Sequence, residues 1–470
     1  MPAVKIIIRR IEMKFNKLLK IVFAAVLAGI MIFAAACTTT PQPDVTTAPE
    51  VTEAPTEEPT EEPITPMEEI LAALASTEFK DCKNVILYIG DGMGQNHAPA
   101  TDAITGGRYN GKLVMECLPH AGIVNTVCTE GEPDSASGGT ALACGYKGKR
   151  KQLGLNNKGE EVMNMTELAK SLGKSAGIIT TESIVDATPA TFSVHAANRN
   201  DESKIAALQI DTSVADFIMG GGKAMYDLLM ENDPSYAQKL VDNKVTWVTK
   251  WEDVLSFSGE GRLIATMTDD YWFEDANTHP SLPEMTEQAI KMLSKNEKGF
   301  FLIVEGGALD EVAHNCDMME LTRHMTSFDE SIEIGVRYAY ENKDTLIVVT
   351  ADHETGGVLP KEEADAYIKK NEKTNQYIAQ EEWCMTNAKL HCLYEAEKIA
   401  QSKNPDVDWN TLPYRFTTIA HTQNKVNVWA YGPGAEKMDN EKLKSFEIGK
   451  FLGESLSGAE FGSTDKNGVK

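Results

Sequence analysis

The sequence predicts an α/β protein in which a mostly parallel, doubly wound sheet is covered by helices on both faces. From Met67 onward, short apolar runs rich in β-formers alternate with segments of helical periodicity. The β-rich runs are apolar throughout, which is typical of strands buried on both faces. Acids and a histidine follow directly after several of these runs. These three observations predict a three-layer fold with a polar site at the carboxyl edge of the sheet.

The elements can be located along the chain. Helical patterns at 285–294 and 319–340 lie between or beside the strand candidates. The strand candidates are Asn84–Ile89, Ala176–Thr180, Phe300–Val304 and Thr345–Val349. We find no internal repeat.

The composition is that of a globular protein with a strong acidic bias. The 470 residues are 42% hydrophobic and 24% charged, and the formal net charge is −25. Because phosphate backbones and anionic lipids repel such a chain, we expect it to bind neither nucleic acid nor an anionic membrane surface. A small anionic substrate requires a local concentration of cations.

The N-terminus predicts an export signal. A basic segment at 13–20 precedes an apolar run at 21–36, and small residues lead directly into Cys37. This end resembles a bacterial lipobox, although Ala34 stands where leucine is usual. We therefore expect residues 1–36 to be a lipoprotein signal peptide and the mature protein to be held at the cell surface through a lipid on Cys37. The alternative is an uncleaved membrane anchor, but the apolar run is shorter than the roughly 20 residues that a span needs.

Two boundaries follow from composition. Residues 37–66 are rich in Thr, Pro and Glu and cannot bury a core, so they predict an extended tether. Residues 67–470 form the predicted catalytic domain. Within it, the pattern from 359 to 414 becomes irregular and rich in Glu, Lys and Asn. This segment is either an insertion over the site, contributing to a dimer surface, or a set of ordinary solvated helices.

Three of the predicted strands end in residues that can bind metal. Asp91 follows the first strand, Glu305 follows the Phe300 strand, and Asp352 with His353 follow the Thr345 strand. The carboxyl ends of parallel strands meet at one edge, where active sites form. Such acids can also be plain helix caps, but three strand ends that deliver acids and a histidine to one edge favour a common site.

Another metal-binding pattern follows Glu305. Asp310 and His314 lie four residues apart and share a helical face. Surface pairs with this spacing are common. Its position just after a strand end is what favours metal binding.

Two further segments have the chemistry of phosphate binding. Ser135 lies among small residues, and a serine at a helix N-terminus sits at the positive end of the helix dipole, which favours phosphate and an alkoxide. A plain N-cap is the alternative. Arg199 follows the segment Asp186–Ala190 and offers a planar fork that matches two phosphate oxygens.

Together these motifs resemble the alkaline phosphatase family. They occur in the family's order and cover roughly residues 80–435. The matching segments are Gly90–Gly94, Asp134–Ala136, Asp186–Ala190 with Arg199, Glu305–Gly307 with Asp310 and His314, Thr350–His353, and His421–Thr422. The resemblance implies a phosphate monoester hydrolase that uses two Zn²⁺ and one Mg²⁺ and passes through a phosphoserine. A homodimer is expected by the same analogy.

The resemblance also implies a role for each matching residue. Ser135 is the expected nucleophile, and Arg199 is expected to bind the phosphoryl group. Asp186 is expected to act through water near the magnesium ion. The expected ligands are Asp310, His314 and His421 for the first zinc, Asp91, Asp352 and His353 for the second, and Asp91, Thr188 and Glu305 for magnesium. Nitrogen and carboxylate ligands suit zinc, and an all-oxygen set suits magnesium.

Two residues depart from the family pattern. Glu311 follows Asp310 at a position where relatives often carry lysine or histidine, so an acid there should weaken product binding or alter the third metal site. Gln423 replaces the glycine that is common after the His-Thr pair, which leaves the shape of the loop near His421 open.

Other functions on the same scaffold are less consistent with the sequence. Sulfatases need a Cys-x-Pro-x-Arg motif, and the nearest segment, Cys117–Ala121, lacks the arginine. Diesterases of this group usually carry a threonine nucleophile and lack a counterpart of Arg199. A non-catalytic phosphate- or metal-binding protein would have a broken set of residues, whereas here the nucleophile, the arginine and the expected ligands are all present.

Overall fold

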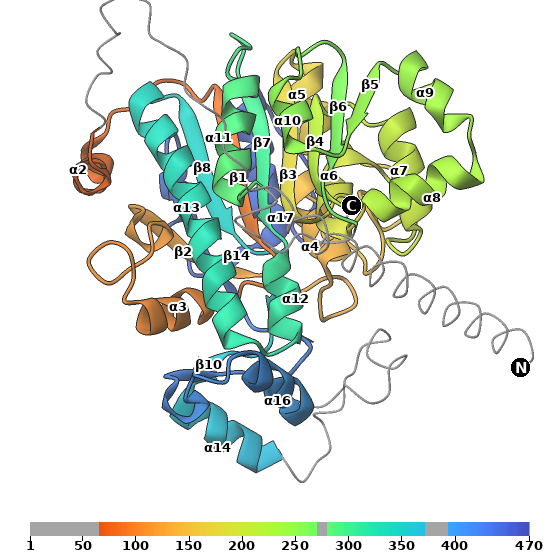
Figure 1. Ribbon diagram of the computed structural model, residues 1–470. Coiled ribbons are helices and arrows are strands. Elements are labelled where there is room, and N and C mark those ends of the chain that lie inside the picture. The colour runs from red at the N-terminus through yellow and green to blue at the C-terminus, as the bar shows by residue number, and fades with distance from the viewer. Residues whose placement is uncertain (1–64, 270–279, 372–392, 470) are drawn as a thin grey trace, which may run out of the picture. The chain divides into compact units, whose positions relative to one another are not determined.

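A large mixed sheet organises the protein in the computed structural model, which describes residues 65–269, 280–371 and 393–469. In these residues the sheet has ten strands in the order β14-β2-β13-β8-β1-β7-β3-β4-β6-β5 (Figure 1). Their bounds are β1 Asn84–Gly90, β2 His120–Asn125, β3 Ser175–Ser183, β4 Phe217–Gly221, β5 Val245–Val248, β6 Arg262–Thr266, β7 Phe300–Gly306, β8 Thr345–Thr350, β13 Val426–Tyr431 and β14 Leu443–Lys444. Among these strands only β13 pairs antiparallel with its neighbours, so the predicted mostly parallel sheet is confirmed.

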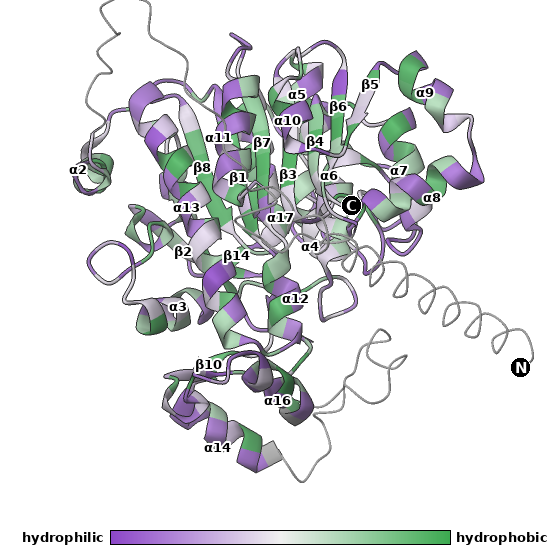
Figure 2. Cartoon of the chain, in the orientation of Figure 1, coloured by the Kyte–Doolittle hydropathy of each residue, from purple (hydrophilic) through white to green (hydrophobic). Residues whose placement is uncertain are grey.

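The four predicted strands are present at the centre of the sheet. Strand β1 lies between β7 and β8, and Val85 pairs with Phe301 on one side and Leu346 on the other. Every residue of β1, β7 and β8 is buried. The central strands are accordingly coloured as hydrophobic in Figure 2. Continuous apolar runs form strands here because both faces of the sheet are covered.

Helices cover both faces, as predicted. One group contacts the sheet through α11 (Leu282–Leu293) and α13 (Met318–Asn342), with α3 (His97–Thr105) and α2 (Met67–Ala73) packed on α13. The other group consists of α4 (Ser135–Cys144), α5 (Met165–Ser171), α6 (Ala187–Ser193) and α17 (Ser445–Ser457), which pack on one another and on β1, β3 and β7. The helices α7 (Glu202–Asp211), α8 (Lys223–Asn232), α9 (Tyr236–Asp242) and α10 (Trp251–Leu255) accompany the strands at the β5 edge (Figure 1).

Local sequence explains where α11 begins. Ser281 caps the helix by accepting a hydrogen bond from the Glu284 backbone, and the Glu284 carboxylate accepts one from the Ser281 backbone N–H. This capping box satisfies amide groups that the first helical turn leaves unpaired. The predicted helices at 285–294 and 319–340 are confirmed as α11 and α13, which begin three residues and one residue before the predicted starts.

The segment predicted as an insertion leaves and rejoins the rest of the fold at one place. Strands β10 (Leu359–Pro360) and β11 (Tyr414–Arg415) pair antiparallel, and α14 (Lys361–Asn371), α16 (Leu393–Lys403) and a short 3₁₀ turn (Trp409–Thr411) lie between them. Arg415 joins the two helices by ion pairs with Asp365 (2.8 Å) and Glu397 (2.7 Å). The function of this segment stays a prediction.

The predicted signal peptide and nearly all of the tether lie outside the described residues, as does 372–392 within the predicted insertion. In the part of the chain that is described, no helix has both the length and the apolar character needed to cross a bilayer.

Candidate active site

The carboxyl ends of β1, β7 and β8 bring the predicted acids together. Asp91 follows β1 directly, Glu305 is the second-last residue of β7, and Asp352 with His353 follow β8. All four side chains are buried. Gly92 adopts a left-handed φ of 67°, and a Cβ atom there would lie 2.5 Å from the Asp310 carboxylate, so the turn after Asp91 requires glycine.

Asp91, Asp352 and His353 form the first of two adjoining clusters. The Nε2 atom of His353 lies 3.1 Å from Asp352 Oδ2 and 3.5 Å from Asp91 Oδ1. Backbone N–H groups of Gly92 (3.1 Å) and His353 (2.9 Å) bind the other oxygen of Asp352 and fix its orientation. The ligand atoms of the three side chains lie within 4.8 Å of one another, so they can bind one metal ion.

Asp310, His314 and His421 form the second cluster. Asp310 and His314 lie one turn apart on α12 (Ala308–His314), and His421 comes from the two-residue strand β12 (His421–Thr422). His314 Nε2 lies 3.1 Å from Asp310 Oδ2 and 3.2 Å from His421 Nε2, and His421 Nε2 lies 3.6 Å from the same carboxylate oxygen. The helical spacing predicted for Asp310 and His314 is thus observed.

Surrounding groups orient both histidines of this cluster. His314 Nδ1 lies 2.6 Å from the Ile419 carbonyl, and His421 Nδ1 lies 3.1 Å from the Pro133 carbonyl. When Nδ1 donates to a carbonyl, Nε2 is left as the metal-binding nitrogen. The ring of His353, from the first cluster, stacks on that of His421, from the second, at a centroid distance of 3.8 Å. The two clusters are therefore in direct contact.

The charges of these clusters are poorly compensated by protein groups alone. Burial and the neighbouring carboxylates raise the pKa of Asp91 well above its usual range and raise that of Asp352 to about 7. Burial also raises the pKa of Asp310, but His314 and His421 outweigh it and hold that pKa well below its usual range. Asp91 Oδ1 and Asp352 Oδ2 have no hydrogen-bond partner among the described residues. Buried oxygens in this state are what a divalent cation would satisfy.

An oxygen-only group adjoins Asp91. The Thr188 hydroxyl donates to Asp91 Oδ2 (3.2 Å), and the Thr180 hydroxyl donates to Glu305. Glu305 Oε1 has no partner in the described part of the chain, and burial raises the Glu305 pKa to about 8. Asp91, Thr188 and Glu305 therefore offer the hard oxygen ligands that magnesium prefers.

Ser135 lies at the junction of these groups. It is the first residue of α4, its side chain is buried, and its Oγ atom lies 3.2 Å from His353 Nε2. Asp134 caps the helix in a capping box with Ser137. The hydroxyl thus sits at the positive end of α4, within reach of the Asp91–Asp352–His353 cluster.

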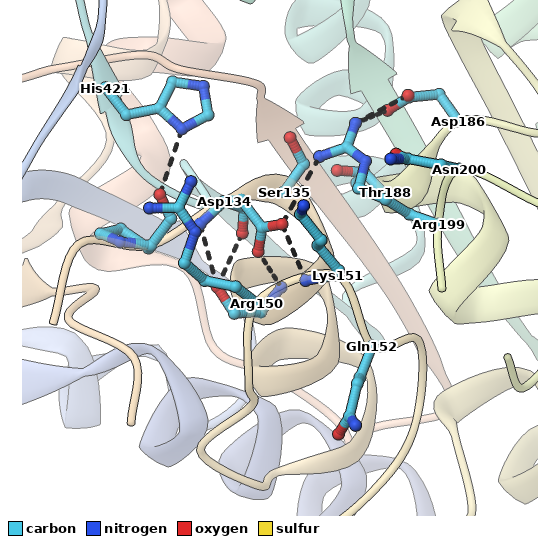
Figure 3. A network of polar contacts seen from close by, with 12 residues as sticks. Asp134, Ser135, Arg150, Lys151, Gln152, Asp186, Thr188, Arg199, Asn200 and His421 are labelled. Carbon is cyan, nitrogen blue, oxygen red and sulfur yellow. Dashed lines mark hydrogen bonds and ion pairs between the residues drawn. The ribbon is translucent and has the colours of Figure 1, made fainter. Parts of the chain in front are cut away.

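Arg199 faces the same helix end. Its Nη2 atom donates to both oxygens of Asp186, at 2.7 and 3.0 Å, and Nη1 lies 4.0 Å from Asp134 Oδ2 (Figure 3). Asp186, predicted near magnesium, therefore contacts Arg199 directly in this structure. Its water-mediated role stays a prediction.

Several residues at the site were missed in the sequence. Glu182, at the end of β3, is buried, and its pKa is raised well above the usual range by burial, Asp186 and Glu311. Its place after an apolar run is the same signal that identified Asp91. The Thr355 hydroxyl donates to Asp310 (2.5 Å) and lies 3.3 Å from His353 Nδ1. No comparable sequence signal identifies Thr355, because its neighbours in the sequence do not reveal these partners.

Comparison with known proteins identifies the family of this chain. The family profile "Alkaline phosphatase" matches residues 82–254 and 265–452. Alkaline phosphatase 3 of Bacillus subtilis is 30% identical over 425 residues, which cover 80% of this chain and 89% of the relative. Alkaline phosphatase 4 of the same organism is 29% identical, with 76% of this chain and 85% of the relative covered.

Solved structures agree with the sequence comparison. The alkaline phosphatase of the Antarctic bacterium TAB5 superposes with a TM-score of 0.64 at 26% identity, covering 81% of this chain and 99% of that one. The residues that match the family profile include all of the clustered side chains. The chain therefore belongs to the alkaline phosphatase family of metal-dependent phosphate monoester hydrolases.

Proposed function

We propose that this protein hydrolyses small phosphate monoesters through a covalent phosphoserine on Ser135, with two zinc ions and one magnesium ion in the site. The observation that carries the proposal is the position of Ser135 Oγ, 3.2 Å from His353 Nε2 at the N-terminus of α4. A hydroxyl placed beside a nitrogen and carboxylate cluster can be activated as a nucleophile.

The donor sets support this metal assignment. Asp310, His314 and His421 would hold the first zinc ion, Asp91, Asp352 and His353 the second, and Asp91, Thr188 and Glu305 the magnesium ion. A variant of the TAB5 enzyme was solved with Mg bound in its M3 site. When bound, these cations would lower the pKa of nearby hydroxyl groups and neutralise charge that develops during phosphoryl transfer.

The protein's own groups account for the remaining steps. Arg199 holds the phosphoryl oxygens, and the α4 dipole favours negative charge at Ser135. Ser135 Oγ gives up its proton to water and forms a bond to phosphorus while the bond to the ester oxygen breaks, and the departing alkoxide takes a proton from water. A water molecule then attacks phosphorus from the opposite side, the bond to Ser135 Oγ breaks, the serine oxygen takes up the proton that the attacking water loses, and phosphate is released.

The cellular setting is part of the same proposal. The basic, apolar and small-residue segments before Cys37 support export and lipid anchoring at the cell surface. The Thr, Pro and Glu-rich tether would hold the catalytic domain away from the membrane. A homodimer is proposed by family analogy alone.

Trapping the intermediate tests the proposal. The zinc- and magnesium-loaded protein is mixed with p-nitrophenyl phosphate, quenched in acid and analysed by peptide mass spectrometry. We expect a phosphoryl group on the peptide that contains Ser135, and loss of both turnover and phosphopeptide in Ser135→Ala. Ser256→Ala, which changes an exposed serine, serves as the control. Full turnover by Ser135→Ala would exclude Ser135 as the nucleophile.

A diester substrate separates the proposed function from its alternative. The serine nucleophile and Arg199 favour a monoester because the guanidinium can bind two free oxygens of a terminal phosphoryl group. We expect the rate with p-nitrophenyl phosphate to exceed that with bis-p-nitrophenyl phosphate by orders of magnitude. Equal rates would favour a phosphodiesterase.

A further inference from the structure

Glu354 is a buried acid that belongs to neither metal cluster. It lies between His353 and Thr355 in the sequence, and only 3% of its surface is exposed. Burying a carboxyl group costs free energy unless hydrogen bonds compensate for the lost water. The groups that surround this carboxyl group therefore indicate what it does.

Four donors surround the Glu354 carboxyl group. Its Oε2 atom accepts from the Thr422 hydroxyl and from Asn424 Nδ2, the latter at 3.4 Å. The backbone N–H groups of Gly357 and Val358 donate to it as well. Burial raises the pKa of this carboxyl group, and the four contacts oppose that rise. Glu354 therefore acts as a hydrogen-bond acceptor between two segments that are far apart in sequence.

The contact with Thr422 lies next to a predicted metal ligand. The strand β9 (Glu354–Thr355) pairs antiparallel with β12, so that Thr355 lies opposite His421 and Glu354 lies opposite Thr422. Each strand is two residues long, so backbone pairing is limited to these two positions. The side-chain bond between Glu354 and Thr422 adds a constraint directly beside His421.

The same carboxyl group holds the loop that departs from the family pattern. Thr422 and Asn424 flank Gln423, and both donate to Glu354. The Asn424 backbone N–H also donates to Thr422 Oγ at 3.0 Å. The loop after His421, whose shape the sequence leaves open, is therefore held on both sides of Gln423 by one acceptor.

Glu354 is itself fixed against the turn that carries Asp91. The Thr355 N–H donates to the Gly92 carbonyl at 2.9 Å. A Cβ atom at Gly94 would lie 2.2 Å from Glu354 Cγ, so a side chain at that position would displace the glutamate. The Glu354 side chain thus extends from a fixed strand toward β12.

We propose that Glu354 is a positioning residue that holds His421, through Thr422, where it can bind the first of the two expected zinc ions. The inference rests on the zinc assignment of the proposed function, but its test measures metal binding instead of turnover. Loss of a hydrogen bond that supports a metal ligand lowers metal affinity by about 10–100-fold. Because Thr422 acts on His421 through the backbone, we expect the lower end of that range.

Stepwise removal of zinc tests this role. The full-length, zinc-loaded protein is titrated with a chromogenic chelator, and the melting temperature of the metal-free protein is measured alongside. Thr422→Val keeps the branched shape and loses the hydroxyl. In this variant we expect one of the two zinc ions to be bound about tenfold more weakly and the other to be bound as before. Thr422→Ser, which keeps the hydroxyl, should restore the original affinity.

Three comparisons make the test specific. Thr326→Val removes a half-buried hydroxyl that donates to the Thr322 carbonyl within α13, and it should leave both zinc affinities unchanged. Glu354→Ala should also weaken one zinc ion, and adding Thr422→Val should weaken it no further, because the contact is already lost. In a His421→Ala background, Thr422→Val should not change the affinity for the zinc ion that remains.

The positioning role is overturned if Thr422→Val lowers only the melting temperature of the metal-free protein and leaves both zinc affinities unchanged. Additive effects of Glu354→Ala and Thr422→Val would also overturn it, because the two side chains would then act separately. An unmodified protein that binds no zinc would instead contradict the proposed function and, with it, the zinc assignment that this role requires.

Discussion

Single side chains set the charge balance of this site, and Glu311 is the clearest case. Its carboxylate helps to raise the pKa values of both Glu182 and His314. The electrostatic field of Glu311 therefore acts both on the end of β3 and on a residue of the second cluster. In Glu311→Lys, a cation replaces this anion near the bound phosphate. We expect the inhibition constant for phosphate to fall several-fold, measured by steady-state competition at fixed ionic strength.

Glu311→Gln is the matched variant for that change. It removes the negative charge without adding a positive one, so its inhibition constant should lie between those of the original protein and Glu311→Lys. An identical inhibition constant in all three proteins would show that the Glu311 charge does not act on the phosphate.

Thr355 tests how much metal binding depends on groups that contact the expected ligands without binding the metal themselves. Its hydroxyl donates to Asp310 at 2.5 Å and lies 3.3 Å from His353 Nδ1, so it touches one residue of each cluster. Thr355→Val removes the hydroxyl and keeps the shape. We expect zinc affinity to fall 10–100-fold, measured by competition with a chromogenic chelator.

Thr286→Val provides the control for that experiment. The Thr286 hydroxyl donates to the Leu282 carbonyl within α11, away from the clustered residues. It should leave zinc affinity unchanged. If both variants hold zinc as the original protein does, Thr355 does not orient the ligands.

At the scale of elements, the site depends on a close contact between α4 and the end of β8. A Cβ atom at Gly138 would lie 2.7 Å from the Asp352 carbonyl oxygen and 2.8 Å from Asp352 Cβ. Both neighbours are main-chain or buried atoms, so the helix must shift. In Gly138→Ala we expect a loss of about 1–3 kcal/mol in the free energy of unfolding by urea, because overpacking a buried contact has that cost.

The same displacement should also impair the site. Ser135 lies one turn before Gly138 on α4, so moving the helix from Asp352 separates the hydroxyl from His353. We expect kcat to fall at least tenfold, since misplacements near 1 Å are costly. Unchanged stability and kcat would mean that α4 adapts to the extra methyl group without moving.

Individual strands and helices were the most predictable part of the fold. The strand at Phe300 and the helix after Met319 follow from local apolar patterns, and strand-end acids such as Asp91 indicate the edge where the site forms. Local patterns do not give the order of strands. Val426–Tyr431 was not among the predicted strands, and nothing in its sequence shows that it lies antiparallel between β2 and β8.

The site itself was predicted by residue type and motif order rather than by geometry. Motif resemblance brought His421 into the set, whereas its orientation by the Pro133 carbonyl depends on a contact 288 residues apart in sequence. Lys151 was not singled out in the sequence, because its left-handed φ of 65° and the hydrogen bond that its N–H donates to Asp134 Oδ2 are visible only in the folded chain.

The whole molecule combines a net charge of −25 with a site expected to bind a dianion. Asp91, Glu305 and Asp352 are buried together, and each has an oxygen without a hydrogen-bond partner in the described structure. Without cations, these like charges repel one another in a poorly solvated region. Metal binding should therefore contribute to the stability of the entire fold as well as to its chemistry.

Chelation tests this coupling in the full-length protein. A ligand that binds only the folded state stabilises it in proportion to the logarithm of ligand concentration over its dissociation constant. We expect EDTA to lower the melting temperature by several degrees and to abolish turnover, and added Zn²⁺ and Mg²⁺ to restore both. In Asp91→Asn, which weakens the carboxylate expected to bridge two metals, the EDTA-induced shift should be smaller. An equal shift in both proteins would place the stabilising metal elsewhere, since Asp91 lies between the Asp352–His353 pair and Thr188.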